Sequence, residues 1–156
     1  KPSSRMVLLK GYSNEGFLFF TNYTSRKGKD LSENPFVALL FFWGELERQV
    51  RIEGRVEKIT HEESSKYFSS RPRPSQIGAL ASEQSKPVAS RSVLEEKFHQ
   101  LTQEFEGKEI PCPKHWGGYI VKPNYFEFWQ GRRSRLPDRI CYRIESGIWK
   151  IERLSP

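Results

Sequence analysis

The sequence has few cysteines and no long apolar run, and these absences exclude several classes of protein. Its two cysteines, Cys112 and Cys141, lie far apart and outside any metal-type spacing. We therefore expect a reduced, intracellular protein without a disulfide framework. No apolar run approaches the roughly 20 residues that span a bilayer, and the N-terminus lacks the apolar core of a signal peptide. These features predict a soluble, cytoplasmic protein without a membrane partner.

Glycine-rich phosphate loops and metal-ligand clusters are also missing. No Gly-x-Gly-x-x-Gly or Walker-type sequence follows a predicted strand, so any bound phosphate must be held by side chains. The three histidines, His61, His99 and His115, do not have the spacing of metal ligands. We expect surface or capping roles for them and no metal site.

The composition favours one domain with an anionic partner. A length of 156 residues with 36% hydrophobic and 13% aromatic side chains is enough to build one sizeable core, so we expect a single domain over residues 1–156. Lysine and arginine total 26 against 19 acids, which gives a net charge of +7. Nucleic acid, a membrane surface and phosphorylated small molecules all carry the complementary charge.

The segment from Glu127 to Arg139 concentrates four arginines and a tryptophan. Its first part alternates aromatic and polar residues as a half-buried strand does, and Gly131 ends that strand. The guanidinium groups that follow suit phosphate or carboxylate oxygens, and Trp129 can stack on a ring. Taken alone, the stretch also fits a solvated basic loop, with Glu127 as a structural acid that pairs with an arginine.

Hydrophobic periodicity predicts a mainly β protein with some α-helix. Helix-start signals occur at Ser25, at the capping-box pair Thr60 and Glu63, at Ser75 and at Ser92. The last helix has apolar residues at helical spacing that we expect in the core: Leu94, Phe98, Leu101 and Phe105. Strands are expected over residues 6–9, 17–21, 37–43, 48–56, 119–121, 125–130, 140–143 and 148–151. Hairpin connections favour an antiparallel barrel or curled sheet with peripheral helices, and not a doubly wound parallel fold.

Several motifs in this order resemble the pyridoxine (pyridoxamine) 5′-phosphate oxidase family over essentially the whole chain. They are Arg5-Met6-Val7-Leu8-Leu9-Lys10, Phe20-Thr21-Asn22 with Ser25-Arg26-Lys27, Glu47-Arg48-Gln49-Val50-Arg51, Tyr67-Phe68-Ser69-Ser70-Arg71-Pro72, Ser75-Gln76-Ile77-Gly78-Ala79, Gln84-Ser85, Trp116-Gly117-Gly118, and Glu127-Phe128-Trp129-Gln130-Gly131 with Arg135-Leu136 and Asp138-Arg139. The resemblance implies an antiparallel FMN-binding split β-barrel, a homodimer, and FMN at the subunit interface.

The resemblance also implies which residues bind the cofactor and the substrate. The FMN site would comprise Arg5, Met6, Val7, Leu8, Lys10, Phe20, Thr21, Arg26, Lys27, Gln49, Gln84, Ser85, Trp129 and Arg139. The substrate site would comprise Lys10, Tyr67, Arg71, Ser75, Arg135 and Pro137, with Arg135 as the catalytic residue that positions the reacting carbon. The chemistry of these side chains agrees, since cations suit the FMN phosphate and amides suit the flavin carbonyls.

The implied reaction converts pyridoxine 5′-phosphate or pyridoxamine 5′-phosphate to pyridoxal 5′-phosphate. A hydride passes from C4′ of the substrate to flavin N5, and O2 then accepts the electrons and leaves as H2O2. This is the FMN-dependent oxidase reaction of vitamin B6 biosynthesis and salvage. No histidine or carboxylate of the chain is required as a general base.

Two departures from the family pattern support an alternative function. Pro137 stands where the family usually has a histidine, and Pro137 has no side-chain donor and no backbone N–H. Family members also carry a further strand and a lid segment before the position of Lys1, so we expect a fragmentary chain. Both features favour a flavin- or pyridoxal-phosphate-binding protein with weak or no turnover. A nucleic-acid-binding small barrel is disfavoured, because the basic residues are scattered and no RNP-like strand pair is present.

Overall fold

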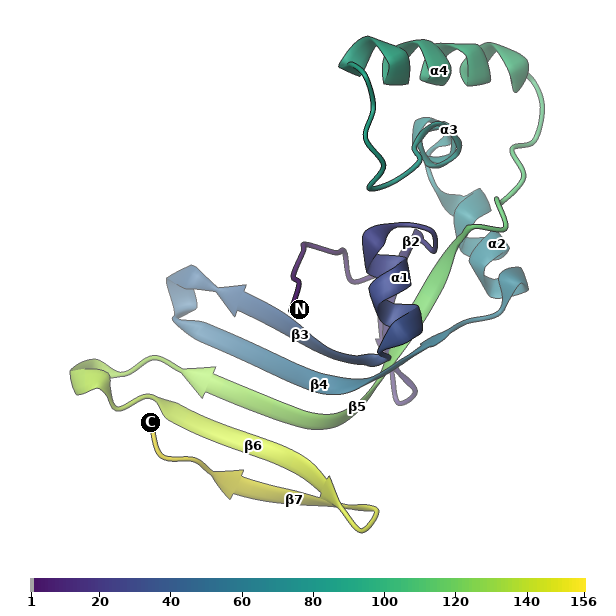
Figure 1. Cartoon of the computed structure of the whole chain (residues 1–156). Helices are drawn as coiled ribbons and strands as arrows, with labels where there is room; N and C mark the ends of the chain where they lie inside the picture. Colours follow the sequence, from purple (N-terminus) through teal and green to yellow (C-terminus); the bar gives the residue numbers. More distant parts are fainter. Residues whose placement is uncertain (1) are drawn as a thin grey trace.

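A single antiparallel sheet of seven strands organises the part of the chain that the structure describes (Figure 1). The computed structural model describes residues 2–156. Its strands are β1 (Gly11–Ser13), β2 (Gly16–Asn22), β3 (Phe36–Trp43), β4 (Arg48–Lys58), β5 (Trp116–Gln130), β6 (Asp138–Glu145) and β7 (Ile148–Arg153). Its helices are α1 (Arg26–Glu33), α2 (His61–Ser70), α3 (Arg73–Ala81) and α4 (Arg91–Glu104), with 3₁₀ turns η1 (Gly44–Leu46) and η2 (Arg133–Arg135). The predicted mainly β, antiparallel fold with peripheral helices is confirmed.

Strand β5 is the central strand of this curled sheet. Strand β4 pairs with β5 along nearly its whole length, whereas the other edge of β5 is shared by two strands. Strand β2 pairs with the first part of β5, and β6 pairs with the last part. The N-terminal end of β5 thus lies among the helices, and its C-terminal end leads into the loop that contains η2 (Figure 1).

The sequence predicted two separate strands where β5 is continuous. The prediction was interrupted at Pro123, which cannot donate a hydrogen bond to a neighbouring strand. The structure accommodates Pro123 opposite Gly54, at a register shift between Glu53 and Gly54. A side chain at Gly54 would meet the Lys122 carbonyl oxygen at 2.2 Å, so the close approach of the backbones requires glycine there. The bulge bends β5 without ending it.

The N-terminal hairpin is present, but its first strand was placed too early. Residues 6–9 form no strand, and β1 begins at Gly11 instead. Arg5 and Ser3 donate hydrogen bonds to Asp30 on α1, which ties this segment to a helix rather than to a sheet edge. Met6 is 96% exposed, so the apolar run that suggested a strand does not pack as one.

Local capping signals predicted two helices well and two less well. Ser25 accepts from the Gly28 amide at the start of α1, and Thr60 and Glu63 form the predicted capping box of α2. Helix α3 begins at Arg73, two residues before Ser75, because prolines are well tolerated in the first helical turn. Helix α4 begins at Arg91, since Ser90 rather than Ser92 accepts the capping bond from Val93.

The core consists of two apolar clusters. One lies on the sheet around Phe19, Val56, Tyr119 and Val121. The other joins the sheet to the helices and contains Phe68, Ile77, Ile110 and Trp116. Trp116 is the first residue of β5, so the second cluster anchors the helices to the N-terminal end of this strand.

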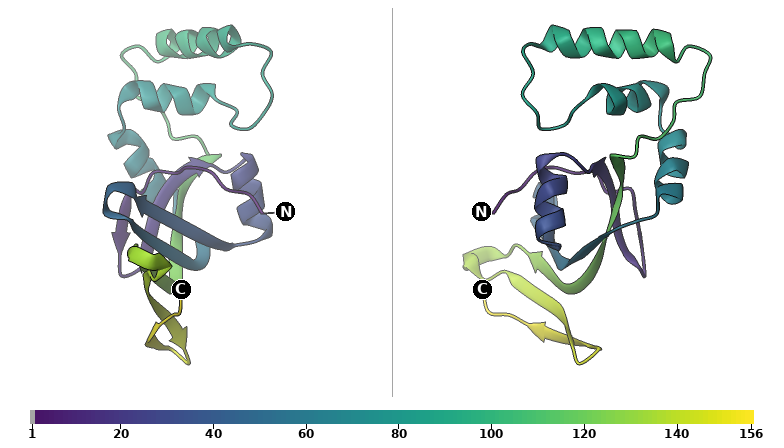
Figure 2. Two further views of the ribbon diagram at one scale, coloured as in Figure 1. Left: turned by 90° about the vertical axis from the view of Figure 1, so that its left-hand side faces the viewer. Right: turned by 45° about the vertical axis from the view of Figure 1, so that its right-hand side comes forward.

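The predicted core face of α4 is confirmed only in part, since no residue of this helix is fully buried. Leu94 is 38% exposed, whereas Phe98, Leu101 and Phe105 pack only at the margin of the second cluster. The physical reason is position: α4 is the outermost element and lies beyond α3 (Figure 2). Helical spacing shows which face is apolar, but not how many neighbours cover it.

Large apolar side chains are exposed on the sheet itself. Phe36, Leu40 and Phe42 of β3 are 67%, 63% and 65% exposed, and Ile148 of β7 is 73% exposed. Both strands lie at edges of the sheet, and exposed apolar residues of this size are typical of interaction surfaces. Within residues 2–156, no helix is long and apolar enough to cross a membrane.

Candidate functional site

Five of the predicted site residues form a basic cluster at the start of α1. We call Arg5, Thr21, Arg26, Lys27 and Gln84 the cationic corner. Lys27 Nζ donates to Thr21 Oγ1, and Thr21 Oγ1 donates to Gln84 Oε1 at 3.1 Å. These contacts join the end of β2, the first turn of α1 and the loop between α3 and α4. Residues far apart in the sequence therefore meet at this corner.

The cationic corner has more positive than negative charge. Burial lowers the pKa of Lys27, and the nearby charge of Arg5 lowers it further. Arg5 pairs with Asp30 at 3.3 Å, but Lys27 has no acidic partner among residues 2–156. Three cations, Arg5, Arg26 and Lys27, lie near one acid, Asp30, and a bound dianion would stabilise this arrangement. The cluster fits a phosphate group.

A second basic site lies on a stack of aromatic rings under α2. The rings of Phe20 and Tyr67 are stacked with centroids 3.9 Å apart, and Phe20 also stacks on Trp116 at 5.3 Å. The Arg71 guanidinium lies 4.8 Å from the centroid of Trp116. We call Phe20, Tyr67, Arg71 and Trp116 the aromatic shelf. Ser75 lies in the first turn of the next helix, α3.

Arg71 on this shelf has an unsatisfied hydrogen-bond donor. Its Nη1 atom is buried and has no partner among residues 2–156. Burial lowers the pKa of Arg71, because the guanidinium is partly removed from water. Buried donors without a partner are rare, and a guanidinium matches phosphate oxygens in geometry and charge. A second anion would therefore satisfy Arg71.

Five other predicted residues lie at the other end of β5: Gln49, Trp129, Arg135, Pro137 and Arg139. Gln49, Trp129 and Arg139 are direct cross-strand neighbours on β4, β5 and β6. Beside them lies a cavity of about 500 Å³. It is lined by Phe42, Glu47, Trp129, Gly131, Arg132, Arg135, Pro137 and Pro156. We call this end of the sheet, with its cavity, the strand-end site.

The loop that carries Arg135 has an unusual backbone. Ser134 and Arg135 are consecutive non-glycine residues with φ values of 62° and 56°. Left-handed conformations of such residues cost roughly 1–2 kcal/mol each. Ion pairs hold the ends of the loop: Arg132 and Arg153 both contact Asp138, the former at 3.0 Å. The loop thus projects the exposed Arg135 side chain at the cavity from a fixed backbone.

Glu127 is a buried partner of two arginines, in agreement with the structural role predicted for it. It is 4% exposed and accepts hydrogen bonds from Arg139, Arg51 and the Tyr125 hydroxyl. Hydrogen bonds from Arg139 and Arg51 outweigh the effect of burial and lower the pKa of Glu127 to about 2. Glu127 therefore stays ionised and holds Arg139 in place.

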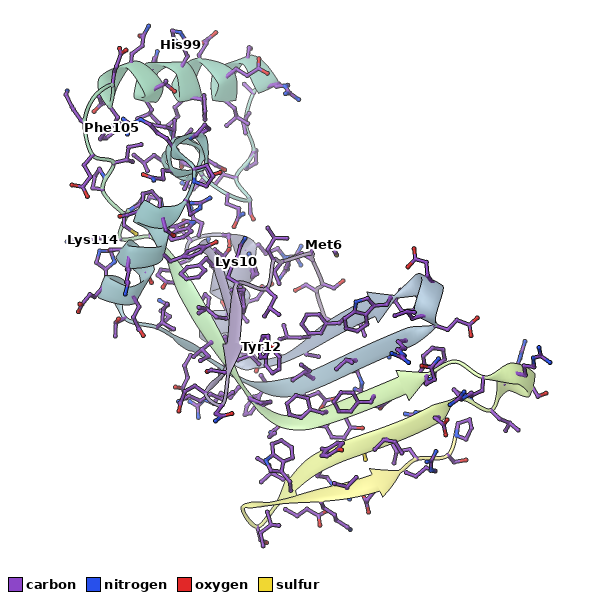
Figure 3. All side chains as sticks on the ribbon, turned by 180° about the vertical axis from the view of Figure 1, so that it is seen from behind. Met6, Lys10, Tyr12, His99, Phe105 and Lys114 are labelled. Carbon is purple, nitrogen blue, oxygen red and sulfur yellow. The ribbon has the colours of Figure 1, made fainter. Side chains whose placement is uncertain are left out.

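Within one chain, the predicted residues form two groups that do not meet. The cationic corner and the aromatic shelf lie where the helices join the sheet, whereas the η2 loop lies at the far end of β5 (Figure 1). Figure 3 shows Met6 and Lys10 on the N-terminal segment, well away from that loop. Sequence reasoning missed Phe42 and Glu47 as cavity residues, because strand register is not readable from the sequence.

The fold and these sites define a protein of the FMN-binding split-barrel class. A model of the pyridoxamine 5′-phosphate oxidase family matches residues 1–105, and a model of the pyridoxine 5′-phosphate oxidase C-terminal dimerisation region matches residues 116–156. A pyridoxine/pyridoxamine 5′-phosphate oxidase of Acaryochloris marina is 56% identical over 156 residues, which cover 100% of this chain and 71% of that protein. The chain belongs to the pyridoxamine 5′-phosphate oxidase family.

Solved structures share the fold. PhzG from Burkholderia lata, in complex with tetrahydrophenazine-1-carboxylic acid, has a TM-score of 0.93 at 30% identity and covers 99% of this chain and 75% of its own. An FMN-binding protein of Nostoc punctiforme has a TM-score of 0.77 at 13% identity and covers 100% of this chain and 82% of its own. The second likeness concerns the fold alone.

Proposed function

We propose that this protein is an FMN-dependent oxidase that converts pyridoxine 5′-phosphate or pyridoxamine 5′-phosphate to pyridoxal 5′-phosphate. The observation that carries the proposal is the presence of two separate cationic sites, each short of negative charge. The cationic corner suits the phosphate of FMN, and Arg71 suits the phosphate of the substrate. Identity of 56% to an oxidase with this substrate name supports the same assignment.

In this proposal, residues 1–156 form one domain that holds FMN through most of the residues named from the sequence. Arg5, Arg26 and Lys27 bind the phosphate, while Gln49, Gln84 and Ser85 offer hydrogen bonds to the flavin. Trp129 covers the ring, and Arg139 contributes from β6. The segment of Met6, Val7, Leu8 and Lys10, with Phe20 and Thr21, completes the cofactor site.

A homodimer would bring the two groups of residues together. The strand-end site and the helical end are separated within one chain, and the sheet between them exposes Phe36, Leu40 and Phe42. Residues 116–156 match the dimerisation region of the family. We infer that a second copy covers this apolar surface and places its strand-end site against the cationic corner of the first copy.

The protein's own residues bind and orient the substrate. Arg71, with Lys10, Tyr67 and Ser75, would hold the substrate phosphate, and Arg135 would lie over the pyridine ring. Bound FMN would supply the redox chemistry, as the acceptor of the C4′ hydride and the donor of two electrons to O2, which with two protons becomes H2O2. With the amine substrate, water then converts the imine to the aldehyde and ammonia. Alignment of this kind supplies roughly 7–11 kcal/mol.

An absorption spectrum of the purified, desalted protein tests this proposal directly. We expect a flavin spectrum that bleaches when pyridoxine 5′-phosphate is added without oxygen, and peroxide in equal amount to product when oxygen is restored. A protein that neither contains FMN nor binds added FMN would contradict the cofactor assignment. Bleaching by unphosphorylated pyridoxine at equal efficiency would contradict the role of Arg71.

A second candidate is a flavin- or pyridoxal-phosphate-binding protein with weak or no turnover. The observation that favours it is Pro137, which lines the strand-end cavity beside Arg135 and has no side-chain donor. A flavin spectrum that stays oxidised with both phosphorylated substrates would support this candidate over the oxidase.

A further inference from the structure

Glu127 and Arg139 form a two-point contact at the strand-end site. Arg139 Nε donates to Glu127 Oε1 at 3.1 Å, and Arg139 Nη2 donates to Glu127 Oε2 at 3.2 Å. Arg139 Nη1 donates to the Ser155 carbonyl oxygen at 3.0 Å. A planar guanidinium held at three atoms cannot turn about its own axis. Its plane and direction are therefore set by the protein before any ligand binds.

Two N–H groups of Arg139 have no partner among residues 2–156. A guanidinium has five N–H groups, and three are used by Glu127 and Ser155. One N–H on Nη1 and one on Nη2 are left for a ligand. Arg139 keeps access to such a ligand, since its side chain is 28% exposed, whereas that of Glu127 is 5% exposed.

Glu127 is itself held from the opposite side. Arg51 Nη2 donates to Glu127 Oε2 at 2.9 Å, and the Tyr125 hydroxyl donates to the same oxygen at 3.1 Å. Arg51 is in turn paired with Glu53 on its own strand. Neighbours on β4 and β5 thus hold the Glu127 carboxylate in place. Because Arg139 of β6 is hydrogen-bonded to this carboxylate, its guanidinium is held in place too.

We propose that Glu127 is a positioning residue for FMN binding, acting through Arg139 by directing two of its N–H groups toward the cofactor at the strand-end site. This inference rests on the proposed function, because it takes FMN as the ligand of Arg139. Glu127 does not contact the cofactor. It removes the rotational freedom of Arg139, which FMN would otherwise have to restrict on binding.

The dissociation constant of FMN tests this role in a double-mutant cycle. We expect Glu127→Gln, which keeps the size of the side chain but removes its charge, to raise the FMN dissociation constant about tenfold. In an Arg139→Gln background the same change is expected to have less than a twofold effect, because the group being positioned is gone. Glu127→Asp, which keeps the charge at a shorter reach, is expected to give an intermediate value.

A matched control separates positioning from loss of sheet stability. Glu57 pairs with Lys122 at 2.7 Å across β4 and β5, the two strands that the Arg51–Glu127 pair also joins, but this pair lies far from Arg139. Glu57→Gln is therefore expected to leave FMN binding unchanged. Melting temperatures of the apoproteins are measured alongside, and Glu127→Asp supplies the comparison if Glu127→Gln does not fold.

The outcomes distinguish this inference from the proposed function. An unchanged FMN dissociation constant in Glu127→Gln, or in Glu127→Asp where only that variant folds, would overturn it. An equal loss with and without Arg139 would overturn it too, because the effect would then be general destabilisation. If Arg139→Gln bound FMN as well as the unaltered protein, the inference would fail while the oxidase assignment stood. If the unaltered protein bound no FMN, the proposed function itself would fail.

Discussion

The two ends of the sheet differ in how several of their cations are paired. Among residues 2–156, Lys27 at the helical end lacks an acidic partner, and Arg71 there has a buried donor without a hydrogen bond. At the strand end, Arg139 and Arg132 are paired with Glu127 and Asp138. Unpaired cations leave room for a ligand's charge, whereas paired cations have fixed orientations. The helical end is suited to capture anions, and the strand end is suited to orient a ring.

The largest expected effect concerns the acid stability provided by Glu127. Its pKa is lowered from 4.5 to about 2, so its stabilising contribution is complete above pH 4.5 and is lost as the pH falls toward 2. The contribution is about 3 kcal/mol. We expect denaturant unfolding between pH 4.5 and 2 to show a steeper loss of stability in the unaltered protein than in Glu127→Gln. Parallel curves would contradict the ion-pair network.

At the helical end, Arg71→Met is expected to separate activity from stability. Loss of a charge-assisted bond to the substrate phosphate costs about 2 kcal/mol, so kcat/KM for pyridoxine 5′-phosphate should fall roughly thirtyfold. The apoprotein should be no less stable, because a buried donor without a partner has been removed. Kinetics and thermal melts check both. A parallel loss of activity and melting temperature would assign Arg71 to the core instead.

At the strand-end cavity, Pro137→His is expected to raise turnover about tenfold while FMN affinity stays the same. The imidazole would add a donor beside Arg135, where Pro137 offers none. A tenfold change corresponds to about 1.4 kcal/mol of transition-state stabilisation. Steady-state peroxide production with each phosphorylated substrate measures it. A Pro137→His enzyme no faster than the present one would remove Pro137 as an explanation for weak turnover.

The smallest expected effect is on the backbone of the η2 loop. Ser134 has a φ of 62°, which glycine adopts without steric cost. We expect Ser134→Gly to gain about 0.5 kcal/mol of stability, since relief of strain slightly exceeds the entropy that glycine adds to the unfolded chain. Ser146, with a φ of 51° in the β6–β7 turn, provides the control. Only the change at Ser134 should alter the KM for substrate.

Sequence reasoning succeeded where the signal is local. The caps at Ser25 and Thr60 are formed by residues within one helical turn, and the alternation along β4 reports directly on which side is buried. It failed where the outcome depends on distant neighbours. The apolar face of α4 is only partly covered by neighbouring elements. Pro123 is tolerated within β5 because Gly54 of β4, opposite it, has no side chain.

For the candidate site too, some features could be predicted from the sequence and others depend on how distant strands pair. A resemblance to a family supplied the residues of the cationic corner and, except for Trp116, those of the aromatic shelf, and the structure brings each set together. The row of Gln49, Trp129 and Arg139 depends on the register of three strands. The double contact of Glu127 with Arg51 and Arg139 depends on the same register, so the sequence indicated only that this acid would pair with some arginine.

The length of β5 has a consequence for how the protein works at low concentration. Trp116 at one end belongs to the aromatic shelf, and Trp129 at the other belongs to the strand-end site. Thirteen steps of about 3.3 Å separate them by roughly 40 Å along the strand. In a homodimer, each complete site would draw one half from each subunit. An Arg71→Met chain mixed with a Trp129→Ala chain would then regain about a quarter of normal activity, and dilution below the dimer dissociation constant would abolish it.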